Sequence, residues 1–111
     1  MSGEPVKIIG KEAFQNRVKL TTVVIEADLD EVSYCAFYGC RHLTTIVYQG
    51  SVKRIGRSAF NLCSRLKEMH LPNGVETIEF RAFRDCKSLR TIFIPASVRE
   101  IGEEAFLNCN E

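Results

Sequence analysis

Residues Val75–Ser97 read VETIEFRAFRDCKSLRTIFIPAS, and this stretch decides the fold because the rest of the chain repeats it. Its Ala-Phe pair, Ala82-Phe83, is one of five such pairs, and each pair follows the previous one by 23 residues. The other pairs begin at Ala13, Ala36, Ala59 and Ala105. A period between about 20 and 50 residues is typical of proteins built from stacked repeats, in which each unit buries its apolar face against its neighbours.

The same step of 23 residues links further apolar positions, which form columns when the repeats are aligned. Columns pass through Val75, Ile78, Leu89 and Ile92, and no insertion or deletion breaks their register. We therefore expect one domain, residues 1–111, because about 100–150 residues is the common domain size. Its units are expected at residues 6–28, 29–51, 52–74 and 75–97, with a partial unit at residues 98–111.

Two different periodicities alternate within each unit. Residues Leu89–Ile94 place Ile92 and Ile94 on one side of an extended segment, which predicts a strand. The segment Ile55–Cys63, in contrast, carries apolar residues at helical spacing, which predicts a short helix or 3-10 turn on the opposite side of the unit. Such short helices would depend on neighbouring units for their stability.

The unit V-x-x-I-G-x-x-A-F-x-x-C-x-x-L-x-x-I-x-I-P-x-S resembles the BspA-like leucine-rich repeat. Residues Ile55–Cys63, IGRSAFNLC, and Ile101–Cys109, IGEEAFLNC, carry the resemblance most fully. It implies an α/β fold, a short right-handed solenoid with parallel strands on the concave side and short helices or 3-10 turns on the convex side. It also implies a non-catalytic protein-interaction module, since similar proteins include bacterial and protozoan surface proteins that mediate adhesion.

Composition limits the partners. The net charge is +1 and no run of basic residues is present, whereas binding to nucleic acid or to an anionic membrane usually uses a concentrated basic surface. No apolar stretch reaches the roughly 18 residues of a membrane span. The segment Met1–Pro5 lacks the apolar core of a signal peptide. We expect a cytoplasmic protein if the chain is complete, and a surface or secreted one if it is a fragment of a family-like parent.

Five cysteines are an odd number, and four of them share one column of the repeat, with Arg17 at the column's first position. We expect these thiols to be reduced and packed as small hydrophobic groups, and Cys35 to lie on the convex turn, accessible to solvent. The spacing of Cys35, Cys40 and His42 is superficially that of a zinc site, but no second pair completes four ligands. We expect no metal, no cofactor and no enzymatic activity, because no nucleophile and base are indicated together.

The strand residues that point away from the core suggest a binding surface. One outward column is unusually apolar for a solvent-facing surface, and a polar column lies beside it. The two columns contribute Val24, Val47, His70 and Phe93, and Thr45, Glu68 and Thr91. Exposed apolar patches often mark interaction sites, so we expect a partner protein to bind here. In the alternative interpretation these residues are only good strand formers, and the repeats are a structural spacer.

The last expectation from the sequence concerns the two ends of the stack. Solenoids normally carry polar terminal units, whereas Phe106 and Cys109 belong to an ordinary internal repeat. Three explanations remain open: a fragment of a longer repeat protein, end-to-end self-association through uncapped edges, or a frayed last unit. Arg17 is expected to lie at an open end and to turn to water, because burying its charge would be costly.

Overall fold

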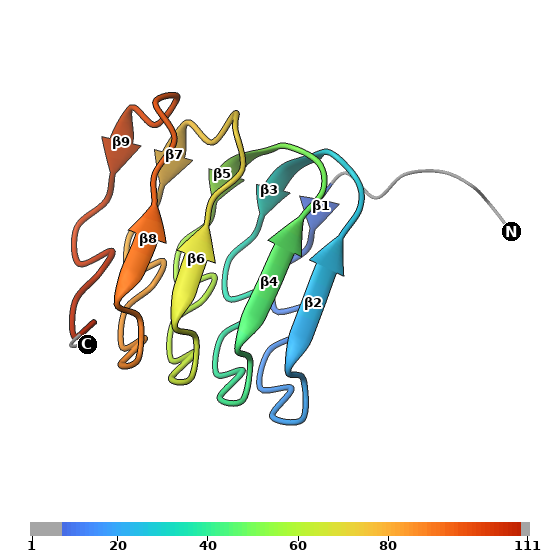
Figure 1. Cartoon of the computed structure of the whole chain (residues 1–111), viewed down its shortest axis with the longest axis vertical. Helices are drawn as coiled ribbons and strands as arrows, with labels where there is room; N and C mark the ends of the chain where they lie inside the picture. The colour runs from blue at the N-terminus through green and yellow to red at the C-terminus, as the bar shows by residue number, and fades with distance from the viewer. Residues whose placement is uncertain (1–7, 110–111) are drawn as a thin grey trace, which may run out of the picture.

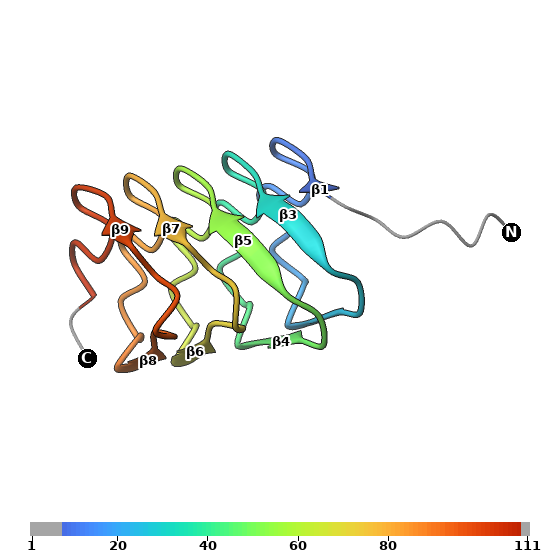
Figure 2. The same cartoon turned by 90° about the horizontal axis from the view of Figure 1, so that it is seen from above.

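The computed structural model describes residues 8–109, which form a coil of parallel strands (Figures 1 and 2). The expected start of the first unit at Val6 and the last two residues of the partial unit lie outside the described residues. One row holds the odd-numbered strands: β1 (Ile8–Ile9), β3 (Leu29–Val32), β5 (Val52–Ile55), β7 (Thr77–Ile78) and β9 (Glu100–Ile101). The other row holds the even-numbered strands: β2 (Thr22–Ile25), β4 (Thr45–Tyr48), β6 (Glu68–His70) and β8 (Thr91–Phe93).

Strand pairing follows the repeat. The odd-numbered strands form a five-stranded parallel sheet in the order β1-β3-β5-β7-β9. Ile55 lies opposite Ile78, and in the other row Val23 lies opposite Ile46, so each residue faces its counterpart one unit away. The expected step of 23 residues is therefore the geometric step of the coil.

The core is a set of parallel files of side chains that run along the axis. Phe37, Phe60 and Phe83 are completely buried. Together with Phe14 and Phe106 they form one continuous stack, with successive ring centroids 5.2, 5.2, 5.3 and 5.4 Å apart and nearly parallel planes. The five phenylalanines that follow alanine thus lie in single file, which confirms the stacked-repeat prediction.

The predicted convex helices or 3-10 turns are not found: the described residues contain neither an α-helix nor a 3-10 helix, and the segment after each odd-numbered strand is a series of tight turns. The backbone N–H of Ala36 donates to the carbonyl of Ser33 within the unit, whereas the N–H groups of Cys35 and Phe37 donate to carbonyls of the next unit. Two residues in each convex segment have a positive φ, for example Cys35 at 55° and Gly39 at 73°. Left-handed residues and N–H groups that point to a neighbouring unit cannot belong to an α-helix.

The odd-numbered strands are a second difference from the expectation, which placed strands on one side only. In β5 the two buried residues are Val52 and Ile55, three positions apart, with Lys53 and Arg54 between them. A regular strand alternates inward and outward residues, so this pattern does not identify a strand in the sequence. Pairing with the neighbouring units, and not the local pattern, makes these segments extended.

Candidate binding face

The outward residues of the even-numbered strands form a continuous outer surface, called here the even-strand face. Inward residues such as Ile46 and Met69 pack into the core, while their neighbours on either side face solvent. Val24, Val47 and Phe93 are 50%, 41% and 53% exposed. Contiguous apolar patches on a protein surface often mark interaction sites. The predicted apolar column is therefore exposed as expected, and it lies along the even-strand face.

This face is interrupted at its centre. β2 pairs with β4, and β6 pairs with β8, but β4 and β6 lie side by side without forming a strand pair. The odd-numbered strands of the same units, β5 and β7, remain paired. The even-strand face is therefore open at one step of the coil, between the second and third units.

The residue that distinguishes this step is Tyr48, the last residue of β4. Its column otherwise holds the aliphatic residues Ile25, Leu71 and Ile94. The Tyr48 hydroxyl is buried without a hydrogen-bond partner among the described residues. Burial raises the pKa of this phenol, and the nearby Cys63 thiol raises it further. The side chain of Tyr48 is larger than the aliphatic residues at the same position of the other units, and we expect its size to keep β4 and β6 from pairing.

An open hollow of about 560 Å³ lies over this step. Its residues come from β4, β6 and the turns that precede β4, β6 and β8. They are Thr44, Thr45, Ile46, Val47, Tyr48, Lys67, Glu68, His70 and Arg90. The volume is within the range of about 300–1,000 Å³ that ligand pockets occupy, but the hollow is open and lies on a strand surface. Such a shape suits a protruding side chain or segment of a partner.

One edge of the hollow is fixed by His70. Its Nε2 atom is 3.0 Å from Oε1 of Glu68, and its ring stacks on Phe93 at a centroid distance of 4.4 Å. Both side chains of the His70–Glu68 pair are more than half exposed, so the electrostatic contribution of the pair is small. The contacts instead hold the imidazole against the Phe93 ring, which makes a flat, partly aromatic surface.

The structure brings together four of the seven residues predicted to bind a partner. Thr45, Val47, Glu68 and His70 line the hollow. Phe93 adjoins it through its contact with His70, whereas Val24 and Thr91 lie on the flanking strands, beside Val47 and Glu68 respectively.

Five residues of the hollow were not predicted as site residues, namely Tyr48, Lys67, Arg90, Thr44 and Ile46. The replacement of an aliphatic residue by Tyr48 in a regular column was the available signal for the first of them. Lys67 and Arg90 share one repeat position, so their common basic character was visible once the repeats were aligned.

Cys40, Cys63 and Cys86 of the cysteine column are buried, as predicted, whereas Cys109 is half-buried, and all four are free thiols in the structure. The thiols of Cys63 and Cys86 donate hydrogen bonds to the carbonyls of Phe37 and Phe60, at 3.2 and 3.1 Å. Burial raises the pKa of both thiols. The expectation that Cys35 is accessible is wrong: it is 7% exposed, and burial raises the pKa of its thiol as well. Its side chain is covered because the convex turns lie directly on one another.

The residues with zinc-like spacing are not brought together. Cys40 lies in the core, with its thiol 3.1 Å from the carbonyl of Phe14, whereas His42 is exposed. Within residues 8–109, no three His, Cys, Asp or Glu side chains gather as a metal site would need. The same residues include no helix long and apolar enough to span a membrane.

A second hollow, of about 540 Å³, lies against the first unit. Phe14, Val23, Ile25 and Leu29 line it, and these residues belong to the same columns that form the core of the inner units. This hollow is the uncovered end of the core among the described residues and has no chemistry of its own. Arg17 is exposed beside this end, as predicted, with its guanidinium 5.9 Å from the centre of the Phe14 ring.

The parallel coil, the 23-residue register and the exposed strand surface define a leucine-rich-repeat solenoid. More specifically, the chain belongs to the BspA-type leucine-rich repeat family, since residues 2–111 match the family described as "BspA type Leucine rich repeat region". Repeats of this kind are commonly protein-interaction modules and are generally not enzymes. No curated protein matches the chain.

Solved structures of bacterial leucine-rich repeat proteins share the fold. A leucine-rich repeat protein from Bacteroides ovatus is 38% identical with a TM-score of 0.78, over 86% of this chain and 24% of its own. A leucine rich cell surface protein from Faecalibacterium prausnitzii is 27% identical, with a TM-score of 0.54 over 95% of this chain and 41% of its own. The T. pallidum leucine-rich repeat protein, 20% identical with a TM-score of 0.52 over 98% of this chain and 72% of its own, agrees in fold alone. The chain thus spans about a quarter of the Bacteroides relative.

Proposed function

We propose that this protein is a non-catalytic interaction module that binds a partner protein on the even-strand face, the face predicted to be concave. The observation that carries the proposal is the opening between β4 and β6, with exposed apolar residues on both sides of it. Solenoids commonly bind partners on an extended strand surface. A hollow at the centre of such a surface accepts one protruding group of the partner. The residues that contribute most to affinity usually fill well-packed pockets near the centre of an interface.

The relatives support an extracellular setting for this activity. The Faecalibacterium structure is titled a cell surface protein, and the family resemblance includes adhesins. We propose that the partner is a protein met at a cell surface, with Val47, His70 and Phe93 at the centre of the contact. Val24, Thr45, Glu68 and Thr91 then form the surroundings of that contact.

A triple variant, Val47→Ser, His70→Ser and Phe93→Ser, tests the proposal. A matched control replaces exposed apolar residues away from the face, Val18→Ser and Leu107→Ser, which are 44% and 40% exposed. Proteins recovered by the immobilised wild-type chain are to be identified, and the affinity of each recovered protein is then measured against all three chains. We expect the face variant to lose at least tenfold in affinity, on the order of the loss at an interface hot spot, while the control retains it.

The same measurement separates the proposal from a structural spacer. A spacer would tolerate polar residues on the even-strand face, so equal affinities for the wild-type chain and the face variant would contradict the proposal. Circular dichroism of each variant establishes that the coil is intact. End-to-end self-association stays a prediction, and sedimentation over a range of protein concentrations tests it.

A further inference from the structure

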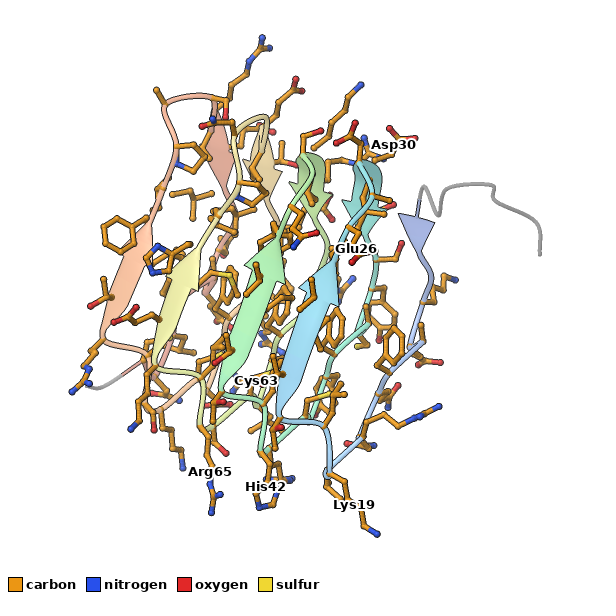
Figure 3. The ribbon with its side chains drawn as sticks, turned by 45° about the vertical axis from the view of Figure 1, so that its right-hand side comes forward. Lys19, Glu26, Asp30, His42, Cys63 and Arg65 are labelled. Atoms are coloured by element: carbon orange, nitrogen blue, oxygen red, sulfur yellow. The ribbon has the colours of Figure 1, made fainter. Side chains whose placement is uncertain are left out.

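A row of basic residues follows one edge of the coil, at the turns that lead into the even-numbered strands. We call it the basic ridge; it consists of Arg17, Lys19, Arg41, His42, Arg65, Lys67, Lys87 and Arg90, and all eight are exposed. Figure 3 shows Lys19, His42 and Arg65 along this edge, and Glu26 and Asp30 at the opposite edge. Seven of the 15 Lys and Arg residues of the chain therefore lie on a single edge.

Acidic residues are absent from the turns that build the ridge. Residues 17–21, 40–44, 63–67 and 86–90 contain no Asp or Glu. The flanking carboxylates are otherwise engaged: Glu68 contacts His70, and Asp85 lies 3.7 Å from Arg84. None of the ridge side chains takes part in an ion pair within the described residues. The turns at the opposite edge, residues 26–28, 49–51, 72–74 and 95–97, carry only Glu26 and Asp28 as charged residues.

Such an arrangement is not the one that stability alone favours. Adjacent units stack about 4.8 Å apart, and like charges in neighbouring positions of a stack repel. Lys67 and Arg90 are direct neighbours, since the N–H of Arg90 donates to the carbonyl of Lys67 at 3.1 Å. Elsewhere the chain avoids this conflict, because Asp30, Lys53, Glu76 and Arg99 occupy one repeat position and alternate in sign. Basic side chains that lie close together along one edge, despite their repulsion, indicate a surface that binds an anionic partner.

The ridge is continuous with the proposed binding face. Lys67 and Arg90 line the hollow over β4 and β6, so a ligand on the ridge can also contact the apolar column of the even-strand face. A ligand that uses both surfaces needs carboxylates or other anions together with apolar groups. A polypeptide has both, whereas a sulfated polysaccharide has only the anions. Proteins that bind single-stranded nucleic acid usually present several aromatic side chains on which the bases stack, and the ridge turns offer only one aromatic ring, that of His42.

We propose that the basic ridge binds an acidic segment of the partner polypeptide, whose apolar residues lie on the even-strand face. The inference rests on the proposed function for the apolar part of the contact, but the ridge can be tested by itself. Arg and Lys side chains spaced along an edge attract an extended acidic chain over distances of about a Debye length, roughly 10 Å at moderate salt. Such charges accelerate association and set the register of the partner.

The test uses a labelled oligoglutamate peptide, which addresses the ridge alone, and a peptide of alternating Glu and Leu, which addresses the ridge and the face. The ridge variant is Arg65→Gln, Lys67→Gln and Arg90→Gln. The control variant, Lys11→Gln, Lys53→Gln and Arg99→Gln, removes the same charge from exposed positions outside the ridge. We expect the ridge variant to bind oligoglutamate about tenfold more weakly, the control to change about twofold at most, and wild-type affinity to fall as salt rises.

The outcomes that overturn the inference are distinct. Absence of oligoglutamate binding at low salt, or equal losses in the ridge and control variants, would show that the ridge is not a site. Tighter ridge-dependent binding of a heparin oligosaccharide or an oligothymidylate would assign the ridge to another class of polyanion. If oligoglutamate binding depends on the ridge but the Glu-Leu peptide is insensitive to Val47→Ser and Phe93→Ser, the ridge stands and the proposed face fails.

Discussion

The two strand rows of the coil are built from the same repeat, yet only the odd-numbered strands form an unbroken sheet. β5 pairs with both β3 and β7, whereas β6 pairs with β8 and not with β4. The odd-numbered strands keep the regular stacking that stability requires. The even-numbered strands lose it at one step, between β4 and β6, where the hollow and the exposed column lie. Departures from local regularity are expected at functional sites, so the comparison indicates where this solenoid acts.

Phe60→Ala has the largest expected effect and acts on both rows, because the phenylalanine file is shared between them. Phe60 is completely buried between Phe37 and Phe83. We expect a loss of about 3–5 kcal/mol in the free energy of unfolding, measured by urea denaturation. Phe106→Ala, at a half-buried position of the same file, is expected to cost less. Equal and small losses would contradict a continuous core.

Gly56→Ala acts on the odd row alone. A Cβ atom at Gly56, just after β5, would lie 2.7 Å from the carbonyl oxygen of Val32, whereas a Cβ atom at Gly10 would meet nothing within 4 Å. We expect Gly56→Ala to destabilise the fold by about 1–3 kcal/mol through overpacking. The matched variant Gly10→Ala is expected to leave thermal stability nearly unchanged, and a similar loss in both would argue against close backbone stacking in the odd row.

Tyr48→Phe tests the even-numbered strands, and it has the smallest expected effect on stability. The buried hydroxyl lacks a partner among the described residues, and a buried unsatisfied polar group costs about 1–3 kcal/mol. We therefore expect removal of the hydroxyl to stabilise the protein by about 1 kcal/mol in chemical denaturation. Tyr38→Phe, at a half-buried position on the convex turns, serves as the control. Destabilisation by Tyr48→Phe would mean that the hydroxyl has a role this account omits.

Much of the architecture was predictable because the repeat is exact in length. From the sequence alone, the columns through Ala82-Phe83 and Cys86 predicted the register, the single file of rings and the buried thiols. The convex turns were not predictable in the same way. Cys35, Ser58 and Arg81 adopt positive φ values of 55–57° without being glycine, and their N–H groups bond to a neighbouring unit. Local helical spacing carries no information about such contacts.

The candidate site was predictable only in part, for a related reason. Alternation within the strands placed Val47 and His70 on an outward face. The opening lies beside one atypical residue, Tyr48, and shows only when neighbouring units are placed in three dimensions. The basic ridge depends on charges that are separated by a whole repeat. Lys19, His42 and Arg65 form no run in the sequence, so the absence of a basic run did not reveal that the coil gathers them on one edge.

Hydrogen–deuterium exchange of the backbone amides tests the contrast between the two rows most directly. Amides that lack a stable strand pairing open more easily and exchange faster. We expect the amides of β6 that point toward β4 to exchange at least about tenfold faster than the amides of β5, and Tyr48→Leu to slow their exchange by allowing β6 to pair with β4. Equal protection of β5 and β6 in the wild-type protein would show that the even row is closed, and would contradict the claim that the coil opens where it binds.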